Sequence, residues 1–212
     1  MTTIFPTLLF ARHGRTAWNL AGRYQGRSDP PISPEGETDA QAIAESLSGE
    51  RLTAIVASPS QRAMMTAQII GERLGVSRMQ VDGRLLELAY GDWEGLTQAE
   101  VKARWPEQLR LWKRTPEAMR FPGGETLAEA RARLLAFVRG SAVLGGTAGS
   151  VLAVGHGGMI RLAILEATGA PLAGFRGVDM DHGSIQSFRL RRDGAAGFLS
   201  LSEVDSHTCE LR

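Results

Sequence analysis

Arginine and histidine side chains follow directly after two apolar runs of the sequence. Arg12 and His13 come after "TLLFA", and His156 comes after "SVLAVG". Arg62 lies shortly after a third apolar run, "TAIVA". Guanidinium groups bind the oxygens of a phosphate through paired hydrogen bonds, and a neutral imidazole is a nucleophile near pH 7. If the fold brings these residues together, they can bind a phosphoryl group and attack it.

The apolar runs are typical of buried strands, and each is followed by a signal for a turn or a helix. We expect strands over Thr7–Ala11, Thr53–Ala57 and Ser150–Gly155, with a further short strand near Met79–Val81. Two of the helix signals place serine and then proline before the first turn. We expect helices over the following segments: Ser33 to about Leu47, Ser60–Leu74, Glu125–Arg139 and Met159–Ala167.

Alternating strands and helices predict a three-layer α/β fold, with a mostly parallel central sheet and helices on both faces. Two late strands, Ser184–Arg191 and Gly197–Val204, resemble a hairpin around Asp193-Gly194 and predict an antiparallel strand at one edge. In open α/β sheets, ligands bind beyond the carboxyl ends of the strands. The arginines and histidines are therefore expected to meet at that end.

The middle of the chain, about 91–124, is less regular and lid-like. We expect two short helices there, over Thr97–Arg104 and Pro106–Arg114. The segment also contains several large aromatic residues. These aromatic residues either line a substrate lid or pack against the main body: Trp93, Trp105, Trp112 and Phe121. We expect residues 1–212 to form a single domain that includes this segment.

Composition excludes several classes of site and partner. Lys+Arg 24 against Asp+Glu 23 leaves a net charge of +1, which gives no overall attraction to nucleic acid or to a membrane. Cys209 is the single cysteine and His residues number 4, so no thiolate zinc site or intrachain disulfide is expected. No GxGxxG, secretion or membrane-spanning signal occurs. We expect no cofactor and no metal, and a cytoplasmic location.

Several segments of the chain together resemble the histidine phosphatase superfamily, which is also called phosphoglycerate mutase-like. They occur in that family's order and cover most of the chain from Leu8 to about Leu165. The segments are "RHGRTAWN" (Arg12–Asn19), "QGRSDPPISPEG" (Gln25–Gly36), "SPSQRAMMTA" (Ser58–Ala67), "LLELAYGDWEG" (Leu85–Gly95), "FPGGET" (Phe121–Thr126) and "GHGG" (Gly155–Gly158).

The resemblance implies a catalytic role for five residues. His13 is the nucleophile that takes the phosphoryl group, and Arg12, Arg62 and His156 hold its equatorial oxygens. Glu87 matches the proton donor of the family. A phosphomonoester dianion repels a nucleophile, so positive charge around the transferring group is what the chemistry needs. The sequence does not decide which nitrogen of His13 attacks.

Further positions match residues that line the pocket in the family. These are the side chains of Asn19 and Gln25 and the backbone of Gly26 and Gly157. Two other carboxylates of the same segment, Glu94 and less readily Asp92, are alternatives to Glu87 as the proton donor.

Two positions depart from the usual sequence of the family. Arg15 stands where glutamate or glutamine commonly follows the RHG motif, and it adds a cation at the pocket mouth, with Arg23 and Arg27 not far along the loop. This predicts a preference for substrates that carry a second negative group. His182 stands where relatives often have asparagine, and it either borders the pocket or caps a loop.

Three functions are compatible with these residues. The first is a metal-independent phosphatase that hydrolyses a small phosphate ester through phosphohistidine. The second is a mutase that uses the same intermediate, and the third is a non-catalytic relative that binds phospho-ligands. The short spacing from Glu87 to His156 and the "FPGGET" segment favour hydrolysis. The specific ester stays open, as does the oligomeric state, for which a homodimer through the late hairpin edge is one option.

Overall fold

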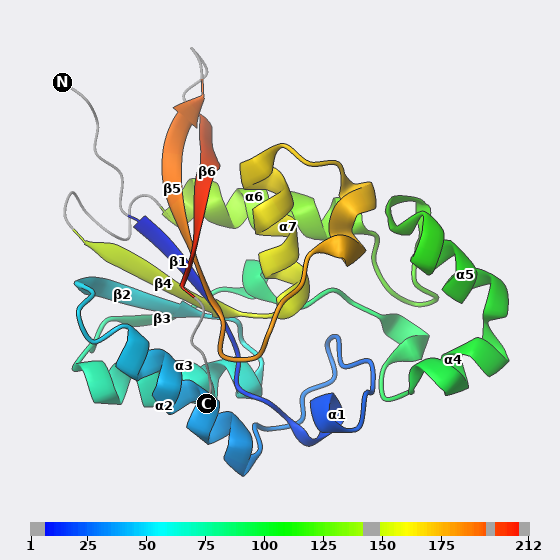
Figure 1. The fold of residues 1–212 in the computed structure, drawn as a ribbon, viewed down its shortest axis with the longest axis horizontal. Coiled ribbons are helices and arrows are strands. Elements are labelled where there is room, and N and C mark those ends of the chain that lie inside the picture. The colour runs from blue at the N-terminus through cyan, green and yellow to red at the C-terminus, as the bar shows by residue number, and fades with distance from the viewer. Residues whose placement is uncertain (1–6, 142–148, 194–197, 208–212) are drawn as a thin grey trace.

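The computed structural model describes residues 7–141, 149–193 and 198–207. A six-stranded sheet runs through the centre in the order β3-β2-β4-β1-β5-β6 (Figure 1). Its strands are β1 (Thr7–Arg12), β2 (Leu52–Ala57), β3 (Met79–Val81), β4 (Ser150–Gly155), β5 (Ile185–Asp193) and β6 (Phe198–His207). The first four are mutually parallel, whereas β5 is antiparallel to β1 and to β6. The predicted α/β fold, with an antiparallel hairpin at one edge, is confirmed.

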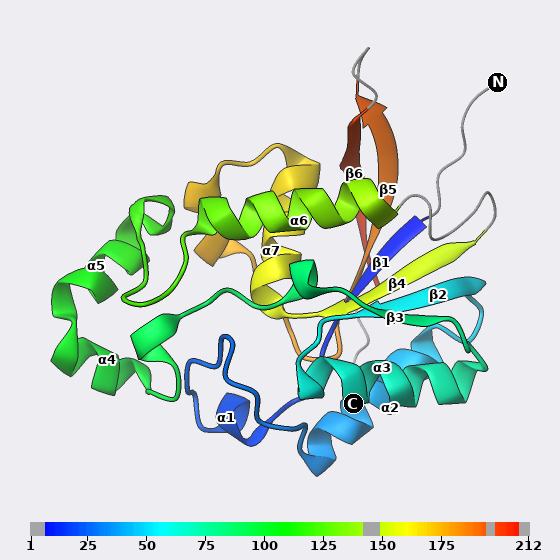
Figure 2. The same cartoon turned by 180° about the vertical axis from the view of Figure 1, so that it is seen from behind.

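Helices cover both faces of the sheet, as the alternation predicted. Helices α2 (Pro34–Ser46) and α3 (Gln61–Leu74) lie on one side, and α6 (Leu127–Ser141) and α7 (Gly157–Thr168) lie on the other (Figures 1 and 2). The cap signals hold in part. Ser33 caps α2 by accepting from the Gly36 N–H, whereas Ser60 precedes α3 without a side-chain cap bond.

The central strands divide the apolar residues between two cores because neighbouring side chains point to opposite faces. Leu9 and Ala11 pack with α2 and α3, whereas Leu8 and Phe10 pack with α6 and α7. Strand β4 alternates in the same way and is buried along its whole length. Burial on both faces explains why these strands read as continuous apolar runs rather than as alternating patterns.

The middle segment contains short helices, as expected, and adds to the core on the side of α6 and α7. It comprises η2 (Gly91–Trp93), α4 (Gln98–Arg104), α5 (Pro106–Arg114) and η3 (Pro116–Ala118). Trp93, Trp112 and Phe121 are buried, with exposed fractions of 0%, 3% and 1%. The packing interpretation is therefore favoured for Trp93 and Phe121, and Trp112 belongs to the same apolar core. The segment lies beyond the carboxyl ends of β1 and β4 (Figure 1).

Short elements were missing from the expected list. The sequence analysis did not anticipate α1 (Ala17–Leu20), η1 (Gly83–Leu85) or η4 (Leu172–Gly177). The expected turn residue Gly194 and the cysteine Cys209 lie outside the described residues. Within the part of the chain that the structure describes, no helix combines the length and apolar character needed to span a bilayer.

Candidate active site

The carboxyl ends of β1, β2 and β4 are level with one another at one edge of the sheet. Arg12 is opposite Gly155 in the parallel pair of β1 and β4. Beyond it, the His13 N–H donates to the Gly155 oxygen at 2.9 Å, and the Ser58 N–H donates to the Val154 oxygen at 2.9 Å. The side chains that follow these strands therefore come together at the edge where open α/β sheets bind ligands.

His13 is buried, with 3% of its surface exposed. Its Nδ1 lies 2.8 Å from the carbonyl oxygen of Gly14. A carbonyl oxygen only accepts hydrogen bonds, so Nδ1 carries the ring proton and Nε2 keeps a lone pair. Burial, followed by the charges of Arg62 and Arg12, holds the pKa of His13 well below its usual value. The ring is therefore neutral near pH 7, with Nε2 free to act as a nucleophile.

The turn after β1 is held by a close approach between two backbone segments. A Cβ at Gly14 would overlap the carbonyl oxygen of Gly36 in α2, and a Cβ at Gly36 would overlap the carbonyl oxygen of Arg15. The Gly14 N–H also donates to Thr66 Oγ1 of α3 at 3.0 Å. Helices α2 and α3 thus fix the backbone that carries His13.

Arg62, at the start of α3, is 1% exposed. Its Nη2 donates to the Gly26 oxygen at 2.6 Å, and its Nη1 donates to the Ser28 oxygen at 2.7 Å. With the amide oxygen of Gln25 turned toward Arg62, Nε donates to it at 2.9 Å. Burial lowers the pKa of Arg62, and the charge of Glu87 opposes that shift. Arg62 therefore fixes the loop 25–28 against the sheet edge.

His156 is fully buried beside His13, with ring centroids 5.1 Å apart. Arg62 Nη2 lies 3.3 Å from its Nδ1, and Ser58 Oγ lies 2.9 Å from its Nε2. Since a guanidinium only donates, Nδ1 is an acceptor and Nε2 carries the proton. Burial, followed by the charge of Arg62, holds the pKa of His156 well below its usual value. Donation from Nδ1 to a phosphoryl oxygen requires a second ring proton, which a bound dianion would favour.

Arg12 has a buried donor with no partner. Its Nη1 donates to the Met180 oxygen at 2.7 Å, whereas no hydrogen-bond acceptor among the described residues reaches its Nε. Burial lowers the pKa of Arg12 to about 10, with the charge of Glu87 opposing the shift, so the side chain is still cationic at pH 7. Leaving a buried donor unpaired is costly. A ligand oxygen at this point would satisfy it.

Glu87 lies against the start of α7. The Gly158 N–H donates to its Oε2 at 3.2 Å, and the Leu88 N–H donates to its Oε1 at 2.8 Å. A Cβ at position 158 would overlap Glu87 Oε1. A glycine at 158 is therefore what lets the carboxylate lie this close to the helix N-terminus.

Glu94, the alternative proton donor, accepts hydrogen bonds from the backbone of two loops. Its carboxylate accepts from the N–H groups of Arg27, Ser28 and Tyr90 at 2.9, 2.7 and 3.1 Å. Neither Glu94 nor Asp92 is part of the cavity wall at the sheet edge, whereas Glu87 is. The geometry therefore favours Glu87 over both alternatives as the carboxylate of the site.

A cavity of about 150 Å³ opens at this edge, between the end of β1, the loop after α1 and the start of α7. Its wall includes these predicted site residues: Arg12, Asn19, Gln25, Glu87 and Gly157. His13, Arg62 and His156 are not part of the wall and form a buried cluster next to it. The cluster meets the wall where Arg62 contacts Gln25 and where His156 precedes Gly157 at the start of α7. Gly26 contributes its carbonyl group to Arg62.

The contacts of Arg15 do not favour its predicted role in substrate binding, which stays a prediction. Its Nε and Nη2 donate to the two carboxylate oxygens of Asp39 in α2, at 2.9 and 2.7 Å, and it is not part of the cavity wall. The hydrogen bonds that Arg15 donates to Asp39 raise the pKa of Arg15. Arg23 does reach the cavity wall but pairs with Glu100 at 3.2 Å. These carboxylates neutralise the cations that were expected to attract a second anionic group.

His182 lies near the nucleophile, with its ring centroid 6.4 Å from that of His13. Its Nδ1 is buried and has no hydrogen-bond partner in the part of the chain that the structure describes. Burial, followed by the charge of Arg12, lowers the pKa of His182 to about 4. The interpretation that His182 borders the histidine cluster is therefore favoured over a loop cap.

Sequence reasoning missed four residues of the cavity wall, which are Tyr24, Tyr90, Gly158 and Arg161. A signal existed for Arg161, because it lies one helical turn after Gly157 and so shares its face of α7. No comparable signal marked the two tyrosines. Burial raises the pKa of Tyr90 above its usual value and also raises that of Tyr24, so both phenols stay protonated near neutral pH.

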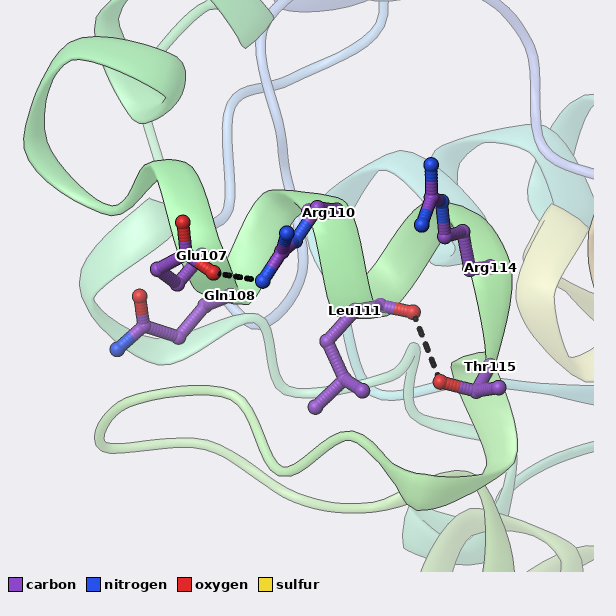
Figure 3. Close-up of a pocket in the computed structure, with 6 residues that line it drawn as sticks. All are labelled: Glu107, Gln108, Arg110, Leu111, Arg114 and Thr115. Carbon is purple, nitrogen blue, oxygen red and sulfur yellow. Dashed lines mark hydrogen bonds and ion pairs between the residues drawn. The ribbon is translucent and has the colours of Figure 1, made fainter.

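A larger hollow, of about 590 Å³, lies along α5 and is separate from this edge (Figure 3). Its lining comes from one helix and the residue after it, and Glu107 there forms an ion pair with Arg110. It shares no residue with the cavity at the sheet edge. We therefore assign it no catalytic role. Among residues 7–141, 149–193 and 198–207, no three His, Cys, Asp or Glu side chains are grouped to hold a metal ion.

The sheet order and the histidine–arginine cluster define an α/β phosphoryl-transfer protein. The chain matches the histidine phosphatase superfamily (branch 1) over residues 8–199 and belongs to it. Phosphatases are among the proteins that it is similar to, which supports the phosphoric monoester hydrolase class.

Three relatives place the chain within this superfamily. Phosphoserine phosphatase 1 of Hydrogenobacter thermophilus is 37% identical over 131 residues, which cover 62% of each chain and so less than two thirds of that enzyme. The structure of mycobacterial glucosyl-3-phosphoglycerate phosphatase with VO3 superimposes with a TM-score of 0.80 and 32% identity, covering 96% of this chain and 98% of that one. A 2,3-bisphosphoglycerate-dependent phosphoglycerate mutase of Brucella anthropi is 30% identical over 93% of this chain and 98% of its own.

The mutase relative corrects one argument from the sequence. Because the alignment covers nearly all of both chains, a protein named as a mutase has about the same length as this one. The short spacing from Glu87 to His156 therefore does not by itself separate phosphatases from mutases.

Proposed function

We propose that the protein hydrolyses small-molecule phosphomonoesters without a metal ion, through a phosphohistidine at Nε2 of His13. The observation that carries this proposal is the hydrogen bond from His13 Nδ1–H to the Gly14 oxygen at 2.8 Å. It leaves the lone pair on Nε2 of a neutral ring that lies among Arg12, Arg62 and His156. A neutral imidazole and fixed cations are what attack on an anionic ester requires.

In the first half of the reaction, Nε2 of His13 attacks phosphorus and the ester P–O bond breaks. The leaving alkoxide takes a proton from Glu87, whose carboxyl group is part of the cavity wall beside α7. In the second half, the Glu87 carboxylate takes a proton from water. The resulting hydroxide attacks the phosphohistidine, which releases inorganic phosphate and restores neutral His13.

Positive charge for the transferring phosphoryl group comes from the protein itself. Arg12 has an unpartnered Nε, Arg62 lies at the start of α3, and α7 begins at Gly157 in the cavity wall. Guanidinium groups and a helix N-terminus both stabilise anions. A relative has been solved with VO3, an oxyanion that resembles a transferring phosphoryl group in shape. This likeness supports an oxyanion site of the same kind here.

The proposal is tested by hydrolysis of p-nitrophenyl phosphate in excess EDTA. We expect the wild-type protein to retain its activity in EDTA, and His13→Ala to lose it by at least about a thousandfold. The Arg110→Gln variant, on the exposed face of α5, serves as the matched control and should behave as the wild type. Loss of wild-type activity in EDTA, or full activity in His13→Ala, would overturn the proposal.

Phosphoryl transfer by a mutase is the second candidate, and the Brucella anthropi relative is the observation that favours it. The two functions differ in the fate of the phosphoryl group. Incubation with 3-phosphoglycerate distinguishes them. A phosphatase releases inorganic phosphate without 2,3-bisphosphoglycerate, whereas a mutase forms 2-phosphoglycerate and needs that activator.

A further inference from the structure

A second hollow, of about 170 Å³, adjoins the catalytic cavity. Three residues line both spaces, namely Tyr24, Tyr90 and Arg161. The remaining walls come from Trp112 of α5 and from η4, which contributes Phe175 and Arg176. A substrate whose phosphoryl group occupies the first cavity would therefore extend its leaving group toward the second.

Two arginines and two aromatic rings form a stack along this second hollow. The Arg161 guanidinium carbon lies 5.8 Å from the centroid of the Phe175 ring. The ring centroids of Phe175 and Trp112 are 5.6 Å apart. The Arg176 guanidinium carbon lies 5.7 Å from the centroid of the Trp112 ring. Cation–π contacts hold a guanidinium by its face and leave its edge free to donate hydrogen bonds. The stack therefore positions both guanidinium groups through their faces, so that their Nη atoms can donate to a ligand.

The two arginines of this stack differ from Arg15 and Arg23 in their partners. Within the described ranges 7–141, 149–193 and 198–207, neither Arg161 nor Arg176 forms an ion pair with a carboxylate; Arg161 Nε donates to the Val178 carbonyl at 2.8 Å. By contrast, Arg15 and Arg23 have carboxylate partners. The hollow is thus a preformed site for an anion.

We propose that this hollow binds a second anionic group, carried on the leaving alcohol of the substrate. Arg161 and Arg176 bind that group, and the four aromatic rings of the wall contact the carbon skeleton that joins it to the phosphate. This inference rests on the proposed function, because it assigns the far end of a phosphomonoester whose near end is at His13. The sequence analysis expected Arg15 to favour a second negative group, whereas this proposal gives that role to residues of α7 and η4.

The proposal is tested by calorimetric binding to the His13→Ala variant, in which the ligand is not turned over. The probes are 3-phosphoglycerate and glycerol 3-phosphate, which differ in a carboxylate at one end. A second pair, propane-1,3-diol bisphosphate and propane-1,3-diol monophosphate, differs in a phosphate at one end. We expect the more anionic member of at least one pair to bind at least tenfold more tightly. The pair that shows the preference identifies the anion as carboxylate or phosphate.

Arg176→Gln, added to His13→Ala, should reduce that preference at least tenfold, or about 1.4 kcal/mol. Arg176 is exposed, so this variant is expected to fold, and thermal melting checks that it does. Arg161→Gln should have the same effect, and Arg110→Gln should leave the preference unchanged. Equal affinities within both probe pairs, or a preference that survives both substitutions, would overturn the proposed subsite.

The two proposals fail in different ways. Hydrolysis of p-nitrophenyl phosphate that does not depend on His13 overturns the proposed function, because this ester carries no second anion. A normal, His13-dependent rate with that ester, together with equal binding of the probe pairs, overturns the subsite alone.

Discussion

Two buried histidines of this protein have opposite tautomers, and neighbouring groups decide which one each adopts. His13 donates from Nδ1 to a carbonyl group, so its Nε2 is the basic nitrogen. His156 accepts at Nδ1 from Arg62 and donates from Nε2 to Ser58. A nucleophile needs the lone pair that His13 keeps on Nε2, whereas His156 can donate from Nδ1 to an anion only after it gains a second proton. The residue types alone do not contain this distinction.

The first prediction at this scale concerns Glu87. Glu87→Gln should lower kcat/KM for glycerol 3-phosphate by about 10²–10⁴-fold, because an alkoxide leaving group needs a proton. The same variant should lose much less activity with p-nitrophenyl phosphate, whose leaving group departs as a stable anion. Steady-state kinetics with both esters provide the measurement.

Glu94→Gln is the matched comparison for this experiment. Since Glu94 holds the backbone of Arg27, Ser28 and Tyr90, its loss should lower the rates with both esters by the same factor. A larger loss with the alkyl ester in Glu94→Gln than in Glu87→Gln would assign the proton donor to Glu94.

At the scale of elements, helix starts and glycines determine how closely the catalytic groups approach one another. Helix α7 begins immediately after β4, so His156 directly precedes the first residues of the helix, Gly157 and Gly158, which are part of the cavity wall. Helix α3 brings Arg62 to the same edge and ties it to the loop 25–28. Both helices begin at the carboxyl end of a parallel strand, which is why the site is built there.

Gly158→Ala tests this close approach. The new Cβ would overlap Glu87 Oε1, so we expect the carboxylate to be displaced and kcat/KM for an alkyl phosphate to fall at least tenfold, or about 1.4 kcal/mol. Gly83→Ala is the control, because a Cβ there meets no atom within 4 Å. Thermal melting shows whether each variant is folded. Full activity in Gly158→Ala would mean that the contact between Glu87 and the helix start is dispensable.

At the scale of the whole molecule, the charged site adjoins two apolar cores, and the fold buries His13 and His156 and partly buries His182 as a result. His13, His156 and His182 all have a pKa below the usual value, with burial as the first cause. The unfolded chain therefore binds more protons than the folded one below about pH 6.5, the ordinary pKa of histidine. Stability is complete above that pH and is lost as the pH falls toward the folded pKa values.

Urea unfolding at pH 7.5 and at pH 5.5 measures this effect. Below pH 6.5, each of the three histidines lowers the free energy of unfolding by up to about 1.4 kcal/mol per pH unit, or about 4 kcal/mol per pH unit together. His182→Gln should reduce the slope by about a third, since its pKa of about 4 lies below the tested range. A free energy of unfolding that is constant between the two pH values would contradict the burial of neutral histidines.

Much of the fold could be predicted because its signals are local. Apolar runs marked β1, β2 and β4, and serine–proline pairs marked the starts of α2 and α3, each within a residue or two of the observed bounds. The elements that were missed are single turns such as α1 and η1. They are too short to show a periodic pattern, and tertiary contacts stabilise them.

The sequence by itself determined the family, the strand–helix order and the residue types that meet at one edge of the sheet. The tertiary structure decided what each of them contacts. Arg15 pairs with Asp39 across 24 positions, Arg27 N–H reaches Glu94 across 67, and Gly158 N–H reaches Glu87 across 71. Local patterns do not encode such partners, because hydrogen bonds and charge pairs depend on distances that exist only after the chain has folded.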